Sequence, residues 1–141
     1  NNGAAINVTL PTVPSSTFTA AGQTVGDTAF TVNVSRCSSE DSNKTLLALL
    51  TDNNDASATN QSGLLKNIHS PNVSVQITDS VGGALSIAPK NINSSNSFFS
   101  FGTIGSSGTV SKAFKARYYS NVDTVPATLV QAQATITLIY N

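Results

Sequence analysis

The chain has 141 residues, enough for one domain with a two-layer core, and its few charges balance at seven basic and seven acidic side chains. This balance excludes a nucleic-acid surface or an anionic-membrane surface, since both need a basic excess. No apolar run approaches the roughly 20 residues of a membrane helix, and the dominance of Asn, Ser and Thr is typical of an all-β, extracellular-type protein.

The first part of the chain predicts two strands separated by a turn. Residues 6–10 alternate between apolar and polar side chains, but Pro11 and Pro14 cannot donate to a ladder, so we expect this strand at a sheet edge or at a change of sheet. Glycines and polar residues predict a turn over 20–27. Alternation then predicts a second strand over 30–37.

A short apolar run and a long polar loop follow. Residues 46–50 are too few for a lone helix and predict a strand that is buried on both faces. Residues 52–63 predict a polar loop. Its DNND motif lacks the spacing of a calcium-binding loop, because Ala56 and Ala58 stand at ligand positions, so a solvated loop is favoured over a metal site.

A hairpin is predicted next. Residues 73–77 alternate, residues 79–83 have the composition of a tight turn, and Leu85 and Ile87 lie on the returning arm.

Three phenylalanines interrupt the Ser-, Asn- and Gly-rich connection over residues 91–109. Phe98, Phe99 and Phe101 either fasten this connection to the core or form a platform for a ligand, and the first interpretation is favoured. A glycan-binding alternative would use these rings or the acidic residues at 52–55. The sequence shows no convergence of such groups beyond what its composition produces.

Two alternating segments end the chain. Residues 110–119 predict one strand, and residues 129–140 predict another that is half-buried, because from position 130 every second residue is apolar. The apolar positions of this last strand are Val130, Ala132, Ala134, Ile136, Leu138 and Tyr140.

These segments amount to about six main strands, which predicts an all-β fold: an antiparallel β-sandwich of immunoglobulin type. That arrangement needs seven strands, and the shortfall falls after Tyr140, where the last strand lacks a second neighbour. The sheet would then expose part of its core together with a row of unpaired backbone groups. We therefore expect an incomplete sandwich that lacks its final strand and is completed by a strand from another chain.

The single cysteine and the single histidine do not predict an active site. Cys37 is either a small buried hydrophobe or the partner of a cysteine upstream of Asn1, and nothing ties it to His69, which lies in a polar loop. The sequence shows no Ser–His–Asp set, no paired carboxylates and no phosphate-binding glycine motif, so we expect no enzyme activity, no cofactor and no metal.

Five short blocks, spread over nearly the whole chain, carry a resemblance to one protein family. They are VTLPTV at 8–13, TAFTVNVSRC at 28–37, VSVQITDSVGGALSI at 73–87, FKARYYS at 114–120 and ATITLIYN at 134–141. Each block alone is weakly specific. In this order, however, they resemble the subunits of chaperone–usher pili, of the type 1 and P pilus kind.

The resemblance implies a single pilin domain over residues 1–141, immunoglobulin-like but without its seventh strand. It also implies three partners: a periplasmic chaperone that lends a strand, an outer-membrane usher, and neighbouring pilus subunits that donate the strand in the fibre. The expected location is extracellular, in an adhesive fimbrium on the bacterial cell surface that is assembled through the periplasm. The residues that would line the acceptor groove for the donated strand are Ile6, Val8, Leu10, Val130, Ala132, Ala134, Ile136, Leu138 and Tyr140.

The chain departs from the family pattern in three places. The family's first cysteine, which the resemblance makes the disulfide partner of Cys37, is absent, and residues 1–5 are too short for the N-terminal extension that donates a strand. Thr128 stands where the family usually has a glycine. We therefore expect a trimmed chain: a shaft subunit without its extension, or the pilin or receptor-binding domain of a tip adhesin that mediates attachment to host glycans.

Overall fold

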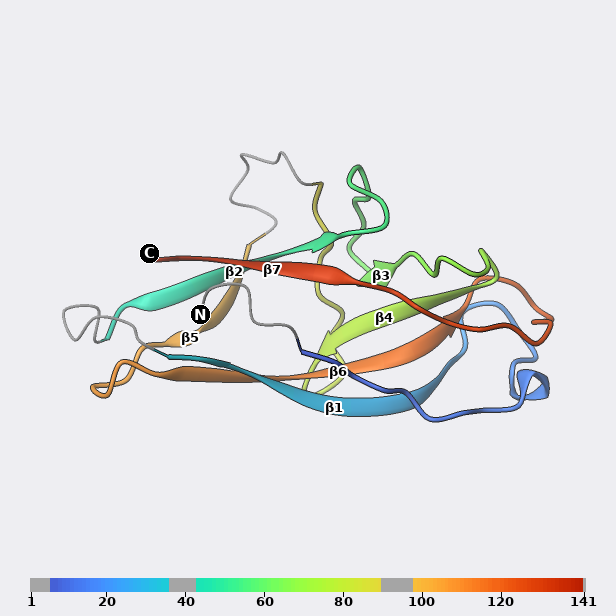
Figure 1. Cartoon of the computed structure of the whole chain (residues 1–141), viewed down its shortest axis with the longest axis horizontal. Helices are drawn as coiled ribbons and strands as arrows, with labels where there is room; N and C mark the ends of the chain where they lie inside the picture. Colours follow the sequence, from blue (N-terminus) through green and yellow to red (C-terminus); the bar gives the residue numbers. More distant parts are fainter. Residues whose placement is uncertain (1–5, 36–42, 90–97, 141) are drawn as a thin grey trace.

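The computed structural model describes residues 6–35, 43–89 and 98–140, and within these ranges the chain is almost entirely β (Figure 1). These ranges contain one short 3-10 helix and seven strands. Their bounds are η1 (Ser15–Thr17), β1 (Thr24–Val34), β2 (Thr45–Asp52), β3 (Leu64–Leu65), β4 (Val73–Asp79), β5 (Phe99–Thr103), β6 (Val110–Ser120) and β7 (Ala134–Tyr140). No helix in the described ranges has the length and apolar character needed to cross a membrane.

The strands form two antiparallel sheets, which confirms the two-layer architecture expected from the sequence (Figure 1). One sheet has the strand order β1-β6-β4-β3, and the other has the order β5-β2-β7. Strands β2 and β7 pair from Leu46 opposite Tyr140 to Asp52 opposite Ala134. In the described part of the chain β7 therefore lies at a sheet edge, with β2 as its ladder partner.

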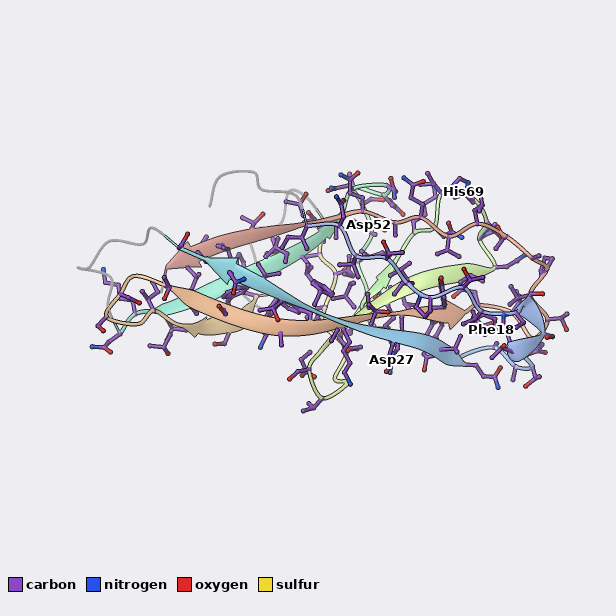
Figure 2. The ribbon with its side chains drawn as sticks, turned by 60° about the horizontal axis from the view of Figure 1, so that its bottom comes forward. Phe18, Asp27, Asp52 and His69 are labelled. Carbon is purple, nitrogen blue, oxygen red and sulfur yellow. The ribbon has the colours of Figure 1, made fainter. Side chains whose placement is uncertain are left out.

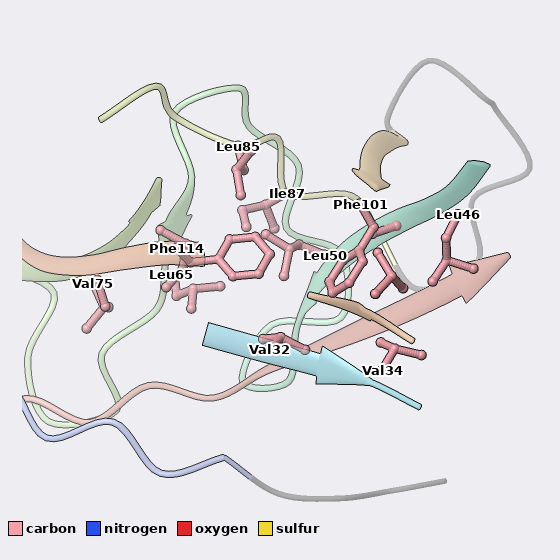
Figure 3. Close-up of a cluster of buried hydrophobic side chains, with 14 of the residues drawn as sticks. Val32, Val34, Leu46, Leu50, Leu65, Val75, Leu85, Ile87, Phe101 and Phe114 are labelled. Carbon is pink, nitrogen blue, oxygen red and sulfur yellow. The ribbon is translucent and has the colours of Figure 1, made fainter. Parts of the chain in front are cut away.

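The core between the sheets is centred on Phe114 of β6, which is only 1% exposed (Figure 3). Its ring stacks on Phe30 at a centroid distance of 5.5 Å and meets Phe99 and Phe101 at 6.2 Å each. Because Phe30 belongs to β1 and the other two rings belong to β5, this cluster joins the two sheets. Aromatic pairs at these separations add to the free energy that apolar burial already supplies.

Strand β2 is buried on both faces, as its apolar run predicts. Leu46, Ala48 and Leu50 belong to the core cluster. Successive side chains of a strand point to opposite faces, so Leu49 points away from that cluster, yet it is only 6% exposed.

The N-terminal segment is not the strand that its alternation predicts. No strand is assigned between residues 6 and 14, and the first regular element is η1. Two prolines remove backbone donors from this segment, and the described residues give it no ladder partner. The predicted strand over 6–10 is therefore wrong for the chain alone, although Val8 and Leu10 do pack against the core.

Strand β1 begins and ends earlier than predicted. Pairing with β6 starts at Thr24, inside the predicted turn over 20–27, because Gly26 adopts φ 81° at an irregularity that lets the ladder continue. The strand ends at Val34. The predicted end at Cys37 lies outside the described residues.

Two strands, β3 and β5, are not predicted from the sequence. Strand β5 lies in the connection that carries the phenylalanines and pairs with β2. Phe99 and Phe101 are thus strand residues packed on the core, which confirms that they fasten this connection. Strand β3 has two residues and follows the predicted polar loop directly.

The hairpin after β4 forms, but its returning arm is short. Asp79 closes the turn by accepting a hydrogen bond from the backbone N–H of Gly83 at 2.9 Å. Leu85 still bonds to β4, whereas Ile87 exchanges two backbone hydrogen bonds with Asn60 and so leaves the hairpin.

Candidate functional site

The side chains along residues 130–138 alternate as the sequence predicts. The five even-numbered positions are half-buried and pack against the core cluster, whereas the odd-numbered positions between them are exposed. We call these five residues the apolar row: Val130, Ala132, Ala134, Ile136 and Leu138. Unlike a core residue such as Leu50, at 2% exposure, each of them contacts the core and still keeps part of its side chain accessible.

The N-terminal residues predicted for the same site are only partly brought together with it. Val8 and Leu10 are half-buried against the same core cluster, but Ile6 is 50% exposed and does not join it. The segment is tied to the four-stranded sheet by Tyr118, whose hydroxyl donates a hydrogen bond to the carbonyl of Pro11 at 2.8 Å. In the view of Figure 1 it starts between β7 and β6 and then crosses β6 and β1.

The backbone N–H and C=O groups of residues 130–138 also alternate in the edge to which they point. Asn53 donates its N–H to the carbonyl of Gln133 at 2.9 Å, and Ile68 donates to the carbonyl of Gln131 at 3.0 Å. In an extended segment, the N–H and C=O groups of one residue point to one edge and those of the next residue point to the opposite edge. The odd-numbered residues therefore direct their backbone groups toward β2 and the loop at 67–68. The apolar row directs its backbone groups toward the other edge, where the described residues form no ladder.

The alternation of side-chain burial and the alternation of backbone direction coincide on the five residues of the apolar row. Each member of the apolar row presents a partly accessible apolar side chain and, at the sheet edge, one N–H and one C=O group. An edge of this kind is a template for a further strand, and its side chains determine which strand fits. The apolar row carries no titratable group, so the arrangement is suited to binding an extended peptide rather than to acid–base or metal chemistry.

Asp52, the last residue of β2 and the first of the predicted polar loop, has a structural role (Figure 2). Asp52 is 1% exposed, and its carboxylate accepts backbone hydrogen bonds from Asn54 at 2.9 Å and Lys66 at 2.8 Å. Such donors offset the cost of burying a carboxylate. The prediction of a solvated loop is therefore wrong for Asp52, although Asp55 is exposed.

A surface hollow of about 440 Å³ lies beside this loop, and no member of the apolar row lines it.

The structure describes His69 but not Cys37, the two reactive residues considered in the sequence. His69 is exposed, and its Nε2 lies 3.3 Å from the side-chain oxygen of Gln131. Cys37 lies outside the described residues, as does the side chain of Tyr140, so the predictions made for them stay predictions. Within the described ranges, no group of three or more His, Cys, Asp or Glu side chains could hold a metal ion.

Two titratable groups have shifted pKa values. Burial raises the pKa of Tyr118 above its ordinary value of 10.0, because a buried phenolate is poorly hydrated. The backbone N–H of Gly83 lowers the pKa of Asp79 below its ordinary value of 3.8, because this hydrogen bond favours the carboxylate. Of these two residues, Tyr118 contacts the N-terminal segment, through its hydrogen bond to the carbonyl of Pro11.

Two residues that shape this edge were not recognisable in the sequence. Asn67 is 4% exposed, and its side chain bonds to the backbone of Leu129 and Gln131. Nothing distinguishes it from the other asparagines of a polar loop. Tyr118 lies on a predicted strand, but alternation indicates only the face on which its ring lies, and not the carbonyl that its hydroxyl reaches.

Comparison with known proteins gives one family. The family model described as "Fimbrial protein" matches residues 1–141. No curated protein sequence matches the chain significantly.

Among solved structures, three similar ones are a fimbria protein, a tip adhesin and a pilus rod subunit. The Burkholderia pseudomallei antigen and type I fimbria protein BPSL1626 is 26% identical, with a TM-score of 0.68 over 99% of this chain and 86% of that one. The CupB6 tip adhesin from Pseudomonas aeruginosa is 18% identical, with a TM-score of 0.70 over 94% of this chain and 34% of that one. The P pilus rod subunit PapA is 12% identical, with a TM-score of 0.57 over 98% of this chain and 94% of that one. The latter two likenesses, at such low identities, show a shared fold.

Proposed function

Because this chain belongs to the fimbrial protein family, we propose that it is a structural pilus subunit that is completed by a β-strand donated from another chain. The occupant of the apolar row is an extended, alternately apolar segment of a neighbouring subunit. Before that exchange a periplasmic chaperone supplies a strand to the same edge, and an outer-membrane usher hosts the exchange. The product is an adhesive fimbrium on the cell surface.

One observation supports this proposal most: the half-buried side chains and the outward-pointing backbone groups belong to the same five residues. A single added strand would therefore pair with the backbone and cover the side chains at once. Val8 and Leu10, which pack on the same core cluster, would form the opposite wall of the groove, with Ile6 and Tyr140 at its ends.

The energetics of this binding follow from two contributions. Each backbone hydrogen bond contributes about 0.5–1.5 kcal/mol net, whatever the sequence of the donor. Each large side chain that the donor buries contributes about 1.5–3 kcal/mol. Because only the second contribution depends on the donor's sequence, the apolar side chains set the register and the differences in affinity between donors.

The test is the uptake of a synthetic strand by the purified chain. The probe is a fluorescein-labelled peptide of about ten residues with Val, Ile or Leu at every second position, called here the alternating peptide. A peptide of the same composition in a scrambled, non-alternating order is the control. The alternating peptide should raise the melting temperature and give a one-to-one complex in native mass spectrometry. Equal binding of both peptides, or binding of neither, would show that the proposal is wrong.

A second candidate is the pilin domain of a tip adhesin, favoured by the TM-score of 0.70 to CupB6, of which this chain covers 34%. The edge would act in the same way there, with a receptor-binding domain joined to it. Direct glycan binding by this chain has less support, because Phe101 is buried in the core and the Asp52 carboxylate is engaged by backbone groups. The gene-encoded sequence before Asn1 separates the candidates: a cysteine and a short alternating segment indicate a shaft or adaptor subunit, whereas a further domain indicates a tip adhesin.

A further inference from the structure

The apolar row is longer than the ladder that supports it. The pairing of β2 with β7 ends where Asp52 faces Ala134, yet the alternation of half-buried side chains continues back to Val130. Backbone groups beyond the end of a ladder need other partners to hold them in place. We propose that Asn67 is a positioning residue that extends the strand-accepting edge to Val130 by taking the place of the missing neighbour strand. This inference rests on the function proposed above.

The side chain of Asn67 makes the hydrogen bonds that a neighbouring strand would make. Its Oδ1 accepts the N–H of Gln131 at 2.9 Å, and its Nδ2 donates to the carbonyl of Leu129 at 3.2 Å. In a ladder, an adjacent strand offers the same acceptor and the same donor on either side of the position that Val130 occupies. The backbone N–H of Ile68 adds a bond to the carbonyl of Gln131 at 3.0 Å.

The surroundings of Asn67 hold its amide in one orientation. The side chain is 4% exposed, and its Oδ1 also accepts the N–H of His69 at 3.1 Å. The residue before it, Lys66, is bonded through its N–H to the carboxylate of Asp52, the last residue of β2. Beyond the end of β2, residues 67 and 68 therefore supply hydrogen bonds to the segment before β7, on the edge that β2 occupies along β7 itself.

Val130 is the residue that these bonds position. It packs against the main core cluster and also against a second, smaller cluster formed by Phe18, Val73 and Val125. With Leu129 and Gln131 bonded to Asn67 on one side, the N–H and C=O of Val130 point to the opposite, open edge. Loss of the Asn67 amide would leave this end of the row held by the Ile68 bond, and a donated strand would lose a docking position.

The test is a double-mutant cycle with the alternating peptide, read as its dissociation rate. Asn67→Ala and Val130→Ala should each speed dissociation about tenfold, the effect expected from losing one buried valine contact. If Asn67 acts through Val130, the double variant should dissociate no faster than Asn67→Ala alone. Effects that multiply in the double variant would overturn the inference.

Asn60→Ala is the matched control. The side chain of Asn60 also makes three hydrogen bonds to nearby backbone, one with Ser62 and two with Leu64 of β3, and none of them reaches the segment before β7. This variant should lower the melting temperature and leave the dissociation rate unchanged. An equal acceleration by Asn60→Ala would mean that Asn67 matters only for stability, and would overturn the inference while the proposed function stands.

Gln131→Pro covers the case in which Asn67→Ala does not fold. Proline removes the N–H that Asn67 accepts and leaves the buried amide in place. This variant should show the same acceleration and the same lack of additivity with Val130→Ala, and additive effects would overturn the inference. If the unaltered chain takes up no alternating peptide, the proposed function itself fails, and the inference fails with it.

Discussion

The hydroxyl of Tyr118 donates a hydrogen bond of 2.8 Å to the carbonyl of Pro11. This bond joins β6 to the N-terminal segment that carries Val8 and Leu10, a segment for which the described residues provide no ladder. Since burial raises the pKa of Tyr118, the hydroxyl keeps its proton, and remains a donor, throughout the neutral range.

Tyr118→Phe should lower the free energy of unfolding by about 0.5–1 kcal/mol at neutral pH, because it removes one exposed hydrogen bond and keeps the ring. A raised folded-state pKa contributes stability that is present below the ordinary value of 10.0 and is lost as the pH rises through the folded-state value. The difference in free energy of unfolding between the unaltered chain and Tyr118→Phe should therefore become smaller above pH 10. Urea unfolding at neutral pH and at about pH 11 measures it, and a gap that stays constant would contradict this account of Tyr118.

Ile136→Asp or Leu138→Asp should abolish uptake of the alternating peptide, because a carboxylate left unpaired under a docked strand costs several kcal/mol. Thr137→Asp is the matched control, since Thr137 lies between them on β7 and points to solvent. It is preferable to Thr135→Asp, because the hydroxyl of Thr135 donates to the side-chain oxygen of Asn53 at 2.7 Å. Fluorescence anisotropy of the labelled peptide measures uptake. Normal binding by either core-facing variant would show that the groove assignment is wrong.

Gly63→Ala should destabilise the fold far more than Gly82→Ala. Both glycines have positive φ, 70° and 94°, where a side chain costs about 1–2 kcal/mol. A Cβ on Gly63 would in addition lie 2.3 Å from the carbonyl oxygen of Ile77, whereas one on Gly82 would meet nothing within 4 Å. Thermal unfolding of the two variants separates the clash from the conformational cost, and equal losses would contradict the close approach at Gly63.

Asp79→Asn should be less stable than the unaltered chain at neutral pH and equally stable in strong acid. The lowered pKa of Asp79, caused first by the Gly83 N–H, contributes stability that is present above pH 3.8 and is lost as the pH falls through the folded-state value. Melting temperatures at neutral pH and at about pH 2 test this. A difference that persists in acid would mean that the asparagine perturbs the turn by another route.

The alternation of residues 130–138 could be predicted because the direction of a side chain along an extended segment is a local property. The residues at which the ladder begins and ends could not be predicted. Residues 6–10 alternate in the same way and form no strand, and β7 starts at Ala134 because β2 ends at Asp52. Alternation therefore reports which face is buried, and not whether the backbone has a partner.

Strand β5 and the role of Asn67 show a second limit. The polar residues around Phe99 and Phe101 are typical of a loop, and only their pairing with β2 makes this segment a strand. Asn67 lies more than 60 residues before the segment it binds, at sequence separations of 62 and 64 from Leu129 and Gln131. Contacts of that range depend on the folded chain, and local sequence patterns do not reveal them.

If the chain accepts a donated strand as proposed, the alternation of side-chain direction along β7 would also limit the errors that the assembly of a fibre can make. A donated strand displaced by one residue would turn its apolar side chains to solvent, so a faulty joint would be displaced by two. Two residues of strand span about 6.6 Å. Length errors in the fibre would then occur in discrete steps of that size rather than as a continuous spread.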